Sequence, residues 1–141
     1  MNPLTRVSKL MSTNLITVMS TTPVTDALSL FEQHRIHHLP VVAADRTLVG
    51  LISQTDITNL VMKNEAQIKV LDVGDIMTTG LAKLEQTDTV ATAANLFMLN
   101  RFHALPVVDG DKIIGMLTTL DLIKLIDSEE VELEDYKEAK A

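Results

Sequence analysis

Two short stretches of the sequence place a hydroxyl and a carboxylate three residues apart. They read Gly50-Leu51-Ile52-Ser53-Gln54-Thr55-Asp56 and Gly115-Met116-Leu117-Thr118-Thr119-Leu120-Asp121. Each passes from an apolar run typical of a strand to the start of a helix, where backbone N–H groups attract anions such as phosphate. Ser53 and Thr118 could donate to a phosphate oxygen, and Asp56 and Asp121 could accept hydrogen bonds from ribose hydroxyls. The same residue types are ordinary helix N-caps, so capping alone is the alternative interpretation.

These stretches belong to a longer repeat. The segment Phe31–Val42 returns as Phe97–Val108, 66 residues later, with Phe, Arg, His and Leu-Pro-Val-Val in the same places. Beyond Val42 the spacing becomes 65 residues, which pairs Gly50 with Gly115 and Asp56 with Asp121. Matches spread over the whole unit indicate two copies of one structural unit.

Each copy predicts the same order of elements, because its apolar residues follow helical and strand spacing in turn. One copy alone has too little core, so we expect an α/β (α+β) module of two pseudo-symmetric β-α-β-β-α repeats, packed sheet to sheet with a cleft between them. We expect the first repeat over residues 1–61, a linker over 62–72, the second repeat over 73–126 and an acidic tail over 127–141. Thr22 and Asp88 are the predicted N-caps of the long helices. The expected elements, repeat by repeat, are a short helix (7–11 and 73–77), a strand (16–18 and 82–84), a helix (24–31 and 90–97), two strands (39–42 with 48–52, and 105–108 with 113–117) and a last helix (56–61 and 121–126).

Composition narrows the class of protein. Apolar residues make up 46% of the chain and aromatic residues 3%, so the core is aliphatic and aromatic platforms for single-stranded nucleic acid are not expected. Residues 127–141 carry a balance of −5, which leaves −2 for the rest and argues against DNA as a partner. The lack of cysteine excludes disulfides, thiolate metal sites and a cysteine nucleophile. No apolar run approaches the ~18 residues of a membrane span, so we expect no membrane association and a cytoplasmic location.

The order helix, Arg-x-His-x-Leu-Pro-Val-Val, turn, Gly-x-x-(Ser/Thr)-x-x-Asp occurs twice and resembles a tandem pair of CBS domains, called a Bateman module, over about residues 7–126. The resemblance implies a regulatory module, not an enzyme, with no catalytic cofactor. It implies binding of AMP, ADP, ATP or S-adenosylmethionine in the cleft, and pairing of two modules into a homodimer. It assigns phosphate binding to Ser53 and Thr118 and ribose binding to Asp56 and Asp121. Any output would then pass through oligomer geometry or an unknown effector protein.

Further contacts follow from the resemblance. In the resembled family, basic side chains at the positions of His37, His38 and His103 often reach the phosphates, commonly from the repeat opposite the ribose-binding Asp. Ala104 stands where the first repeat has His38 and cannot contact phosphate, so the two clefts should differ in affinity. Thr17 and Lys83 lie where the family's first strand meets the nucleotide, and Ile16 and Pro40 could help form an apolar slot for adenine. The predicted nucleotide-binding set is Asp56, Asp121, Ser53, Thr118, His37, His38, His103, Thr17, Ile16, Lys83 and Pro40.

Three alternatives stay open at this point. A structural dimerisation module would leave its clefts empty. A hydrolase using His37 or His103 is disfavoured, because the chain has no nucleophile elbow, no phosphate-binding glycine loop and no cysteine. A metal at His34, His37 and His38 is disfavoured, because the second copy keeps only His103. For the tail we expect a solvated or frayed helix.

Overall fold

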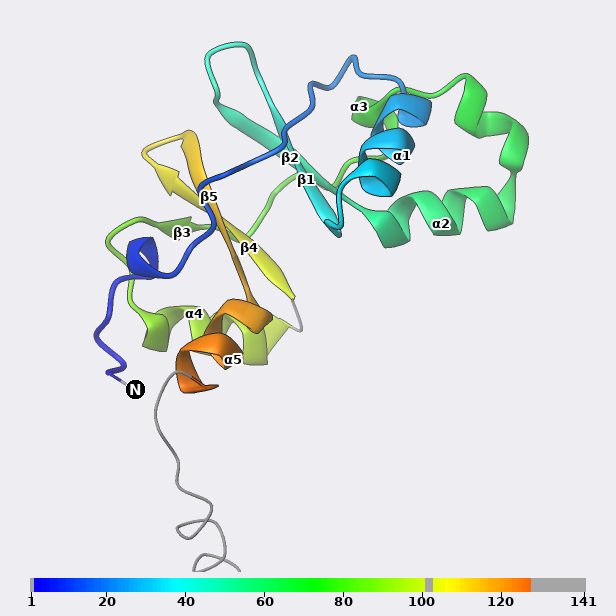
Figure 1. Ribbon diagram of the computed structural model, residues 1–141. Coiled ribbons are helices and arrows are strands. Elements are labelled where there is room, and N and C mark those ends of the chain that lie inside the picture. The colour runs from blue at the N-terminus through cyan, green and yellow to red at the C-terminus, as the bar shows by residue number, and fades with distance from the viewer. Residues whose placement is uncertain (1, 101–102, 128–141) are drawn as a thin grey trace, which may run out of the picture.

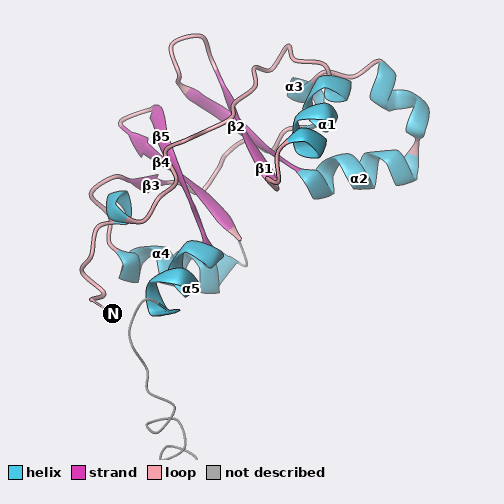
Figure 2. Cartoon of the chain, viewed as in Figure 1, coloured by secondary structure: helices cyan, strands magenta, loops and turns pink. Residues whose placement is uncertain are grey.

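The computed structural model describes residues 2–100 and 103–127, so the tail from residue 128 and the motif residues Arg101 and Phe102 lie outside the described part (Figure 1). Strands form the middle of the molecule, with α1, α2 and α3 at one end and α4 and α5 at the other (Figure 2). In chain order, with η for a 3-10 helix, the elements are η1 (Val7–Lys9), α1 (Val24–Gln33), β1 (His38–Val42), β2 (Leu48–Ser53), α2 (Gln54–Lys63), η2 (Glu65–Lys69), α3 (Val73–Ile76), β3 (Leu84–Glu85), α4 (Val90–Asn100), β4 (Ala104–Asp109), β5 (Lys112–Thr118) and α5 (Thr119–Asp127).

Each repeat is built on an antiparallel hairpin, β1 with β2 and β4 with β5. Both hairpins change register at equivalent places, between Val41 and Val42 and between Val107 and Val108. In the second repeat β3 adds a parallel strand to β4. In the first repeat the predicted strand over 16–18 is reduced to one parallel bridge between Val18 and Val41. Among the described residues of this segment, Val18 alone forms backbone hydrogen bonds with β1, so the prediction of a full strand was wrong.

The two hairpins pack against each other through a small apolar cluster. Its buried members are Val42, Ala104, Ile113 and Met116. The hairpin turns also bond across the repeats, since Leu48 N–H donates to the carbonyl of Asp111 at 3.0 Å and Ile113 N–H to that of Arg46 at 3.1 Å. The predicted packing of two repeats sheet to sheet is therefore confirmed.

The first helix of each repeat packs into the core of the other repeat. Val7 of η1 is fully buried with Leu84, Ala93 and Phe97, whereas Val73 of α3 is buried with residues of the first repeat such as Phe31. Backbone hydrogen bonds fix both exchanges: Val7 N–H donates to the carbonyl of Asp88, and Val73 N–H to that of Thr22, both at 2.8 Å. Figure 1 shows η1, in dark blue, beside β3 and α4. The repeats of the sequence are thus not separate cores in space.

The predicted linker over residues 62–72 is folded rather than extended. It contains the end of α2 and all of η2, and Ile68 of η2 is only 8% exposed within the core of the first repeat. The segment packs against the core because Ile68 supplies an apolar side chain that can be buried there. The overall bounds of the repeats remain a prediction.

The caps of two helices and the first residues of two others differ from prediction by one or two residues. The N-cap of α1 is Pro23 rather than Thr22, whose hydroxyl instead accepts from Met19 N–H at 3.0 Å. Before α4, Thr92 N–H donates to the hydroxyl of Thr89, while Asp88 accepts from Glu85 N–H, so Asp88 was the wrong cap. The last helices begin at Gln54 and Thr119, two residues before Asp56 and Asp121.

Candidate functional site

Asp56 and Ser53 form a reciprocal capping box at the start of α2. Ser53 N–H donates to Asp56 Oδ2 at 2.8 Å, and Asp56 N–H donates to Ser53 Oγ at 3.1 Å. Thr118 and Asp121 repeat this arrangement at the start of α5, at 2.9 and 3.2 Å. All four side chains are partly buried. The capping interpretation is therefore true of both motifs. It leaves room for a second role, because a carboxylate has about four acceptor positions and the box uses one of them.

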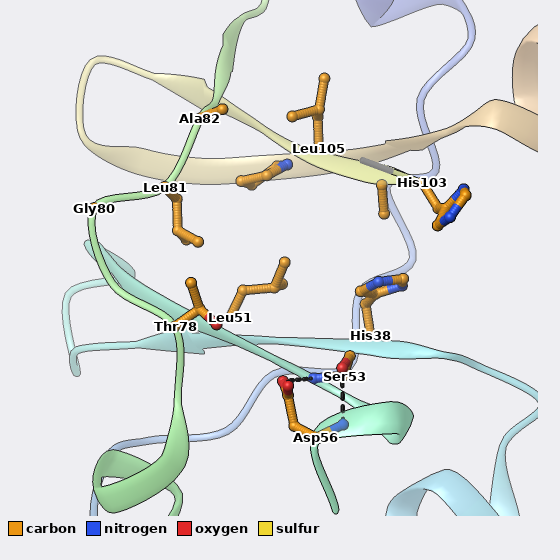
Figure 3. Close-up of a pocket in the computed structure, with 12 residues that line it drawn as sticks. His38, Leu51, Ser53, Asp56, Thr78, Gly80, Leu81, Ala82, His103 and Leu105 are labelled. Carbon is orange, nitrogen blue, oxygen red and sulfur yellow. Dashed lines mark hydrogen bonds between the residues drawn. The ribbon is translucent and has the colours of Figure 1, made fainter. Parts of the chain in front are cut away.

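A cavity of about 330 Å³ opens beside Asp56, between the two repeats. This volume falls in the range of small-molecule sites, roughly 300–1,000 Å³. Leu51 and Leu81 project toward each other in its middle, and Asp56 and Ser53 lie along one side (Figure 3). Leu105 also borders the cavity, but its side chain points away from it, into the core of the second repeat. The lining comprises His38, Leu51, Ser53, Asp56, Thr78, Gly80, Leu81, Ala82, His103, Ala104, Leu105 and Pro106.

Two imidazoles close one end of the cavity from opposite repeats. The ring of His38, at the start of β1, and the ring of His103, just before β4, face each other (Figure 3). Burial lowers the pKa of His38 from its ordinary value of 6.5, His37 and His103 lower it further, and Asp56 opposes the shift. His38 is consequently neutral near pH 7 in this arrangement.

The cavity gathers four of the predicted site residues: Asp56, Ser53, His38 and His103. His37 does not line it; its Nδ1 lies 3.1 Å from Gln54 Oε1 on the exposed surface. Lys83 lies in a neighbouring hollow with Leu48 and Val49. The other predicted residues, which lie outside this cavity, are Asp121, Thr118, Thr17, Ile16 and Pro40.

Several lining residues were missed by the sequence prediction. Ala82 and Pro106 stand 66 residues after Ile16 and Pro40, so carrying the predicted apolar slot from one repeat to the other would have found them. Thr78 and Gly80 carry no such signal. They line the cavity because the chain after α3 runs along β2, where Leu51 and Thr78 exchange both backbone hydrogen bonds at 3.0 and 2.9 Å.

The lining offers an apolar slot with hydroxyl and carboxylate groups beside it. That combination suits a ligand with a flat apolar part and a sugar-like polyol. Among the described residues, no three His, Asp or Glu side chains are grouped to hold a metal ion. Within the same residues, no helix is both long enough and apolar enough to cross a membrane.

Comparison with known sequences matches both repeats to one family. The family model described as CBS domain covers residues 7–63 and 73–128. A CBS domain-containing protein of Dictyostelium discoideum is 34% identical over 130 residues, which cover 85% of this chain and 90% of that protein. A homoserine O-acetyltransferase of Methanocorpusculum labreanum is 33% identical over 129 residues, which cover 89% of this chain but 25% of that protein. The chain thus spans about a quarter of the length of the first curated relatives that it matches.

Two solved structures share the fold over nearly their whole length. CBSX2, a protein of Arabidopsis thaliana solved in complex with AMP, has a TM-score of 0.78 and 31% identity, covering 88% of this chain and 97% of its own. The CBS domain pair of protein MJ0100, in complex with 5′-methylthioadenosine and S-adenosylmethionine, has a TM-score of 0.81 and 26% identity, covering 91% and 100%. Two matched domains, hairpins packed face to face and a cavity between them show that this chain belongs to the CBS domain family, as a tandem pair.

Proposed function

We propose that this chain is a regulatory module that binds an adenosyl ligand, such as AMP, ADP, ATP or S-adenosylmethionine, in the cavity at Asp56. The observation that carries the proposal is the capped carboxylate of Asp56, which lines an apolar cavity between the two repeats. In the proposed complex, adenine lies between Leu51 and Leu81, and the ribose hydroxyls donate to Asp56. The ligands of CBSX2 and MJ0100, two proteins of the same family, share this adenosine part.

Regulation would follow from the position of the cavity. A ligand there touches both repeats, so it favours the relative arrangement in which both sets of contacts are made. At a hundredfold excess over its dissociation constant it would add about 2.7 kcal/mol to stability. We propose no catalytic role, and the homodimer, the effector protein and the cytoplasmic location stay predictions.

The pseudo-symmetry extends the proposal to a second cleft at Asp121 and Thr118. There the place of His103 would be taken by His37 of the first repeat, and the place of His38 by Ala104 of the second repeat. We expect this second cleft to bind more weakly, because it lacks one of the two imidazoles.

The test is a ligand titration with a matched pair of aspartate variants. Asp56→Ala removes both a capping bond and the proposed ribose contact. Asp75→Ala is the control, because Asp75 Oδ2 accepts from Asp72 N–H at the same 2.8 Å, but lies outside the cavity. AMP, ATP and S-adenosylmethionine are added in turn while the melting temperature and the heat of binding are followed.

We expect Asp56→Ala to weaken binding by roughly 10- to 100-fold, the loss of hydrogen bonds to a charged group. Asp75→Ala should lower the melting temperature by a similar amount and leave the affinity unchanged. If no adenosyl ligand binds, or if both variants weaken binding equally, the proposal is wrong and a structural dimerisation module becomes the better interpretation.

A further inference from the structure

The carboxylate and the imidazoles of the cavity lie in different parts of it. Among its described lining residues, the titratable side chains are Asp56, His38 and His103. Asp56 is held in its capping box along one side, whereas the two imidazoles face each other at one end (Figure 3). Whatever group a bound adenosine carries on its 5′ carbon would have to lie near one of these two regions.

We infer that His38, with His103 opposite, is a proton-dependent selector of the charge on the 5′ group of the adenosyl ligand. When His38 is protonated, this end of the cavity favours an anionic phosphate, and when His38 is neutral it tolerates a cationic sulfonium. The inference rests on the proposed function, because it concerns the ligand of that same cavity.

The physical basis is the coupling between charge and proton uptake. Imidazole is the side chain whose ordinary titration lies between about pH 5 and 8. Burial keeps the pKa of His38 below 6.5 in this cavity, so the ring carries little charge there near pH 7. An anion placed against the ring stabilises its charged form, and binding therefore takes up a proton. A cation has the opposite effect and is best accepted when the ring is neutral.

The groups that face His38 set the direction of this effect. His37 precedes it in the chain, just before β1, Asp56 approaches from the start of α2, and His103 approaches from the other repeat. Two of these three, His37 and His103, are further imidazoles that lower the pKa of His38. Only the carboxylate of Asp56 opposes, and it is shared with Ser53 N–H. Lower pH therefore makes this end of the cavity more positive.

The second repeat supplies a natural substitution for His38. At the equivalent position it has Ala104, which is buried at the start of β4. Alanine is therefore compatible with this position of the hairpin, and His38→Ala should fold. His34→Ala is a suitable control, because His34 is an exposed imidazole at the end of α1 and does not line the cavity.

The experiment compares three adenosyl probes whose 5′ groups carry different charges. The methyl ester of AMP is a phosphodiester that stays a monoanion, 5′-methylthioadenosine is neutral and S-adenosylmethionine carries a sulfonium cation. Dissociation constants are measured by calorimetry at about pH 5.5 and about pH 7.0, below the titration of the α-amino group of S-adenosylmethionine, roughly 7.7–8.0.

We expect the anionic probe to bind about 3- to 10-fold more tightly at the lower pH, the effect of less than one linked proton per site over this range. S-adenosylmethionine should bind more weakly there, and 5′-methylthioadenosine should change little. His38→Ala should remove most of the difference between the anionic and cationic probes, and His34→Ala should keep it.

The outcomes separate the two proposals. If none of the three probes binds, the proposed function itself fails. If 5′-methylthioadenosine binds but all three probes share one pH dependence, or if folded His38→Ala protein keeps the full difference, the charge selector is wrong and the proposed function stands.

Discussion

Gly50 holds the clearest stability prediction, because its missing side chain lets the segment after α3 lie against β2. A Cβ atom at Gly50 would stand 2.6 Å from the Sδ atom of Met77 and 3.1 Å from the carbonyl oxygen of Thr78. The Met77 side chain can rotate away, but the Thr78 carbonyl accepts a hydrogen bond from Leu51 N–H and cannot withdraw without breaking it. Forcing a methyl group into such a site costs about 1–3 kcal/mol.

We therefore expect Gly50→Ala to lower the melting temperature by about 3–10 °C, measured by calorimetry. In a Met77→Ala background, Gly50→Ala should cost less, with a coupling of about 0.5–3 kcal/mol in a double-mutant cycle, because the contact with Sδ disappears and that with the carbonyl remains. The variant should also bind adenosyl ligands more weakly, since Thr78 lines the cavity. A Gly50→Ala protein as stable as the wild type, or fully additive effects of the two substitutions, would refute this reasoning.

The remaining predictions concern the connecting segment, a histidine and a surface ion pair. Ile68→Ala should lower the free energy of unfolding, measured with urea, by about 2–4 kcal/mol because Ile68 is buried. Val70→Ala, at a side chain 77% exposed, should change it little. Equal losses of stability would mean that the segment is not part of the core. Since burial lowers the folded-state pKa of His38 below its ordinary 6.5, the unfolded chain binds more protons below that pH. The contribution of neutral His38 to the free energy of unfolding should be complete above pH 6.5 and fall as the pH drops. His38→Ala should flatten that part of the profile of stability against pH. Asp45 and Lys112 form an ion pair of 2.9 Å on the surface, and Lys112 holds the pKa of Asp45 well below its usual range. Because water screens exposed ion pairs, Lys112→Ala should lower the melting temperature less than Gly50→Ala does. The effect should be smaller still in high salt.

Local signals in the sequence predicted the local structure well. The two hairpins and the two long helices lie where apolar periodicity placed them, because each buries one face against its own repeat. The caps were displaced by one residue for a local reason. Thr22 and Asp88 turn their oxygens to the backbone of Met19 and Glu85, three residues earlier, so neither remains for the helix that follows.

Contacts between distant parts of the chain could not be predicted in the same way. Nothing in the spacing of Val7 or Val73 says which repeat each side chain enters, because either core would bury it equally well. The same distinction between local signals and distant contacts applies to the candidate site. Asp56 and Ser53 were found from a motif within one segment, whereas Thr78 and Gly80 reach the cavity only through pairing between segments.

The exchange of first helices between the repeats has a consequence for how the chain can be divided. A cut between η2 and α3 would leave the N-terminal fragment without Val73 and the C-terminal fragment without Val7, each a fully buried side chain of the core it completes. Neither fragment would contain a complete core, whereas the two fragments together contain all the core residues. Expressed as separate polypeptides, they should stay largely unstructured alone and reassemble on mixing, as complementing halves of a single cooperative unit.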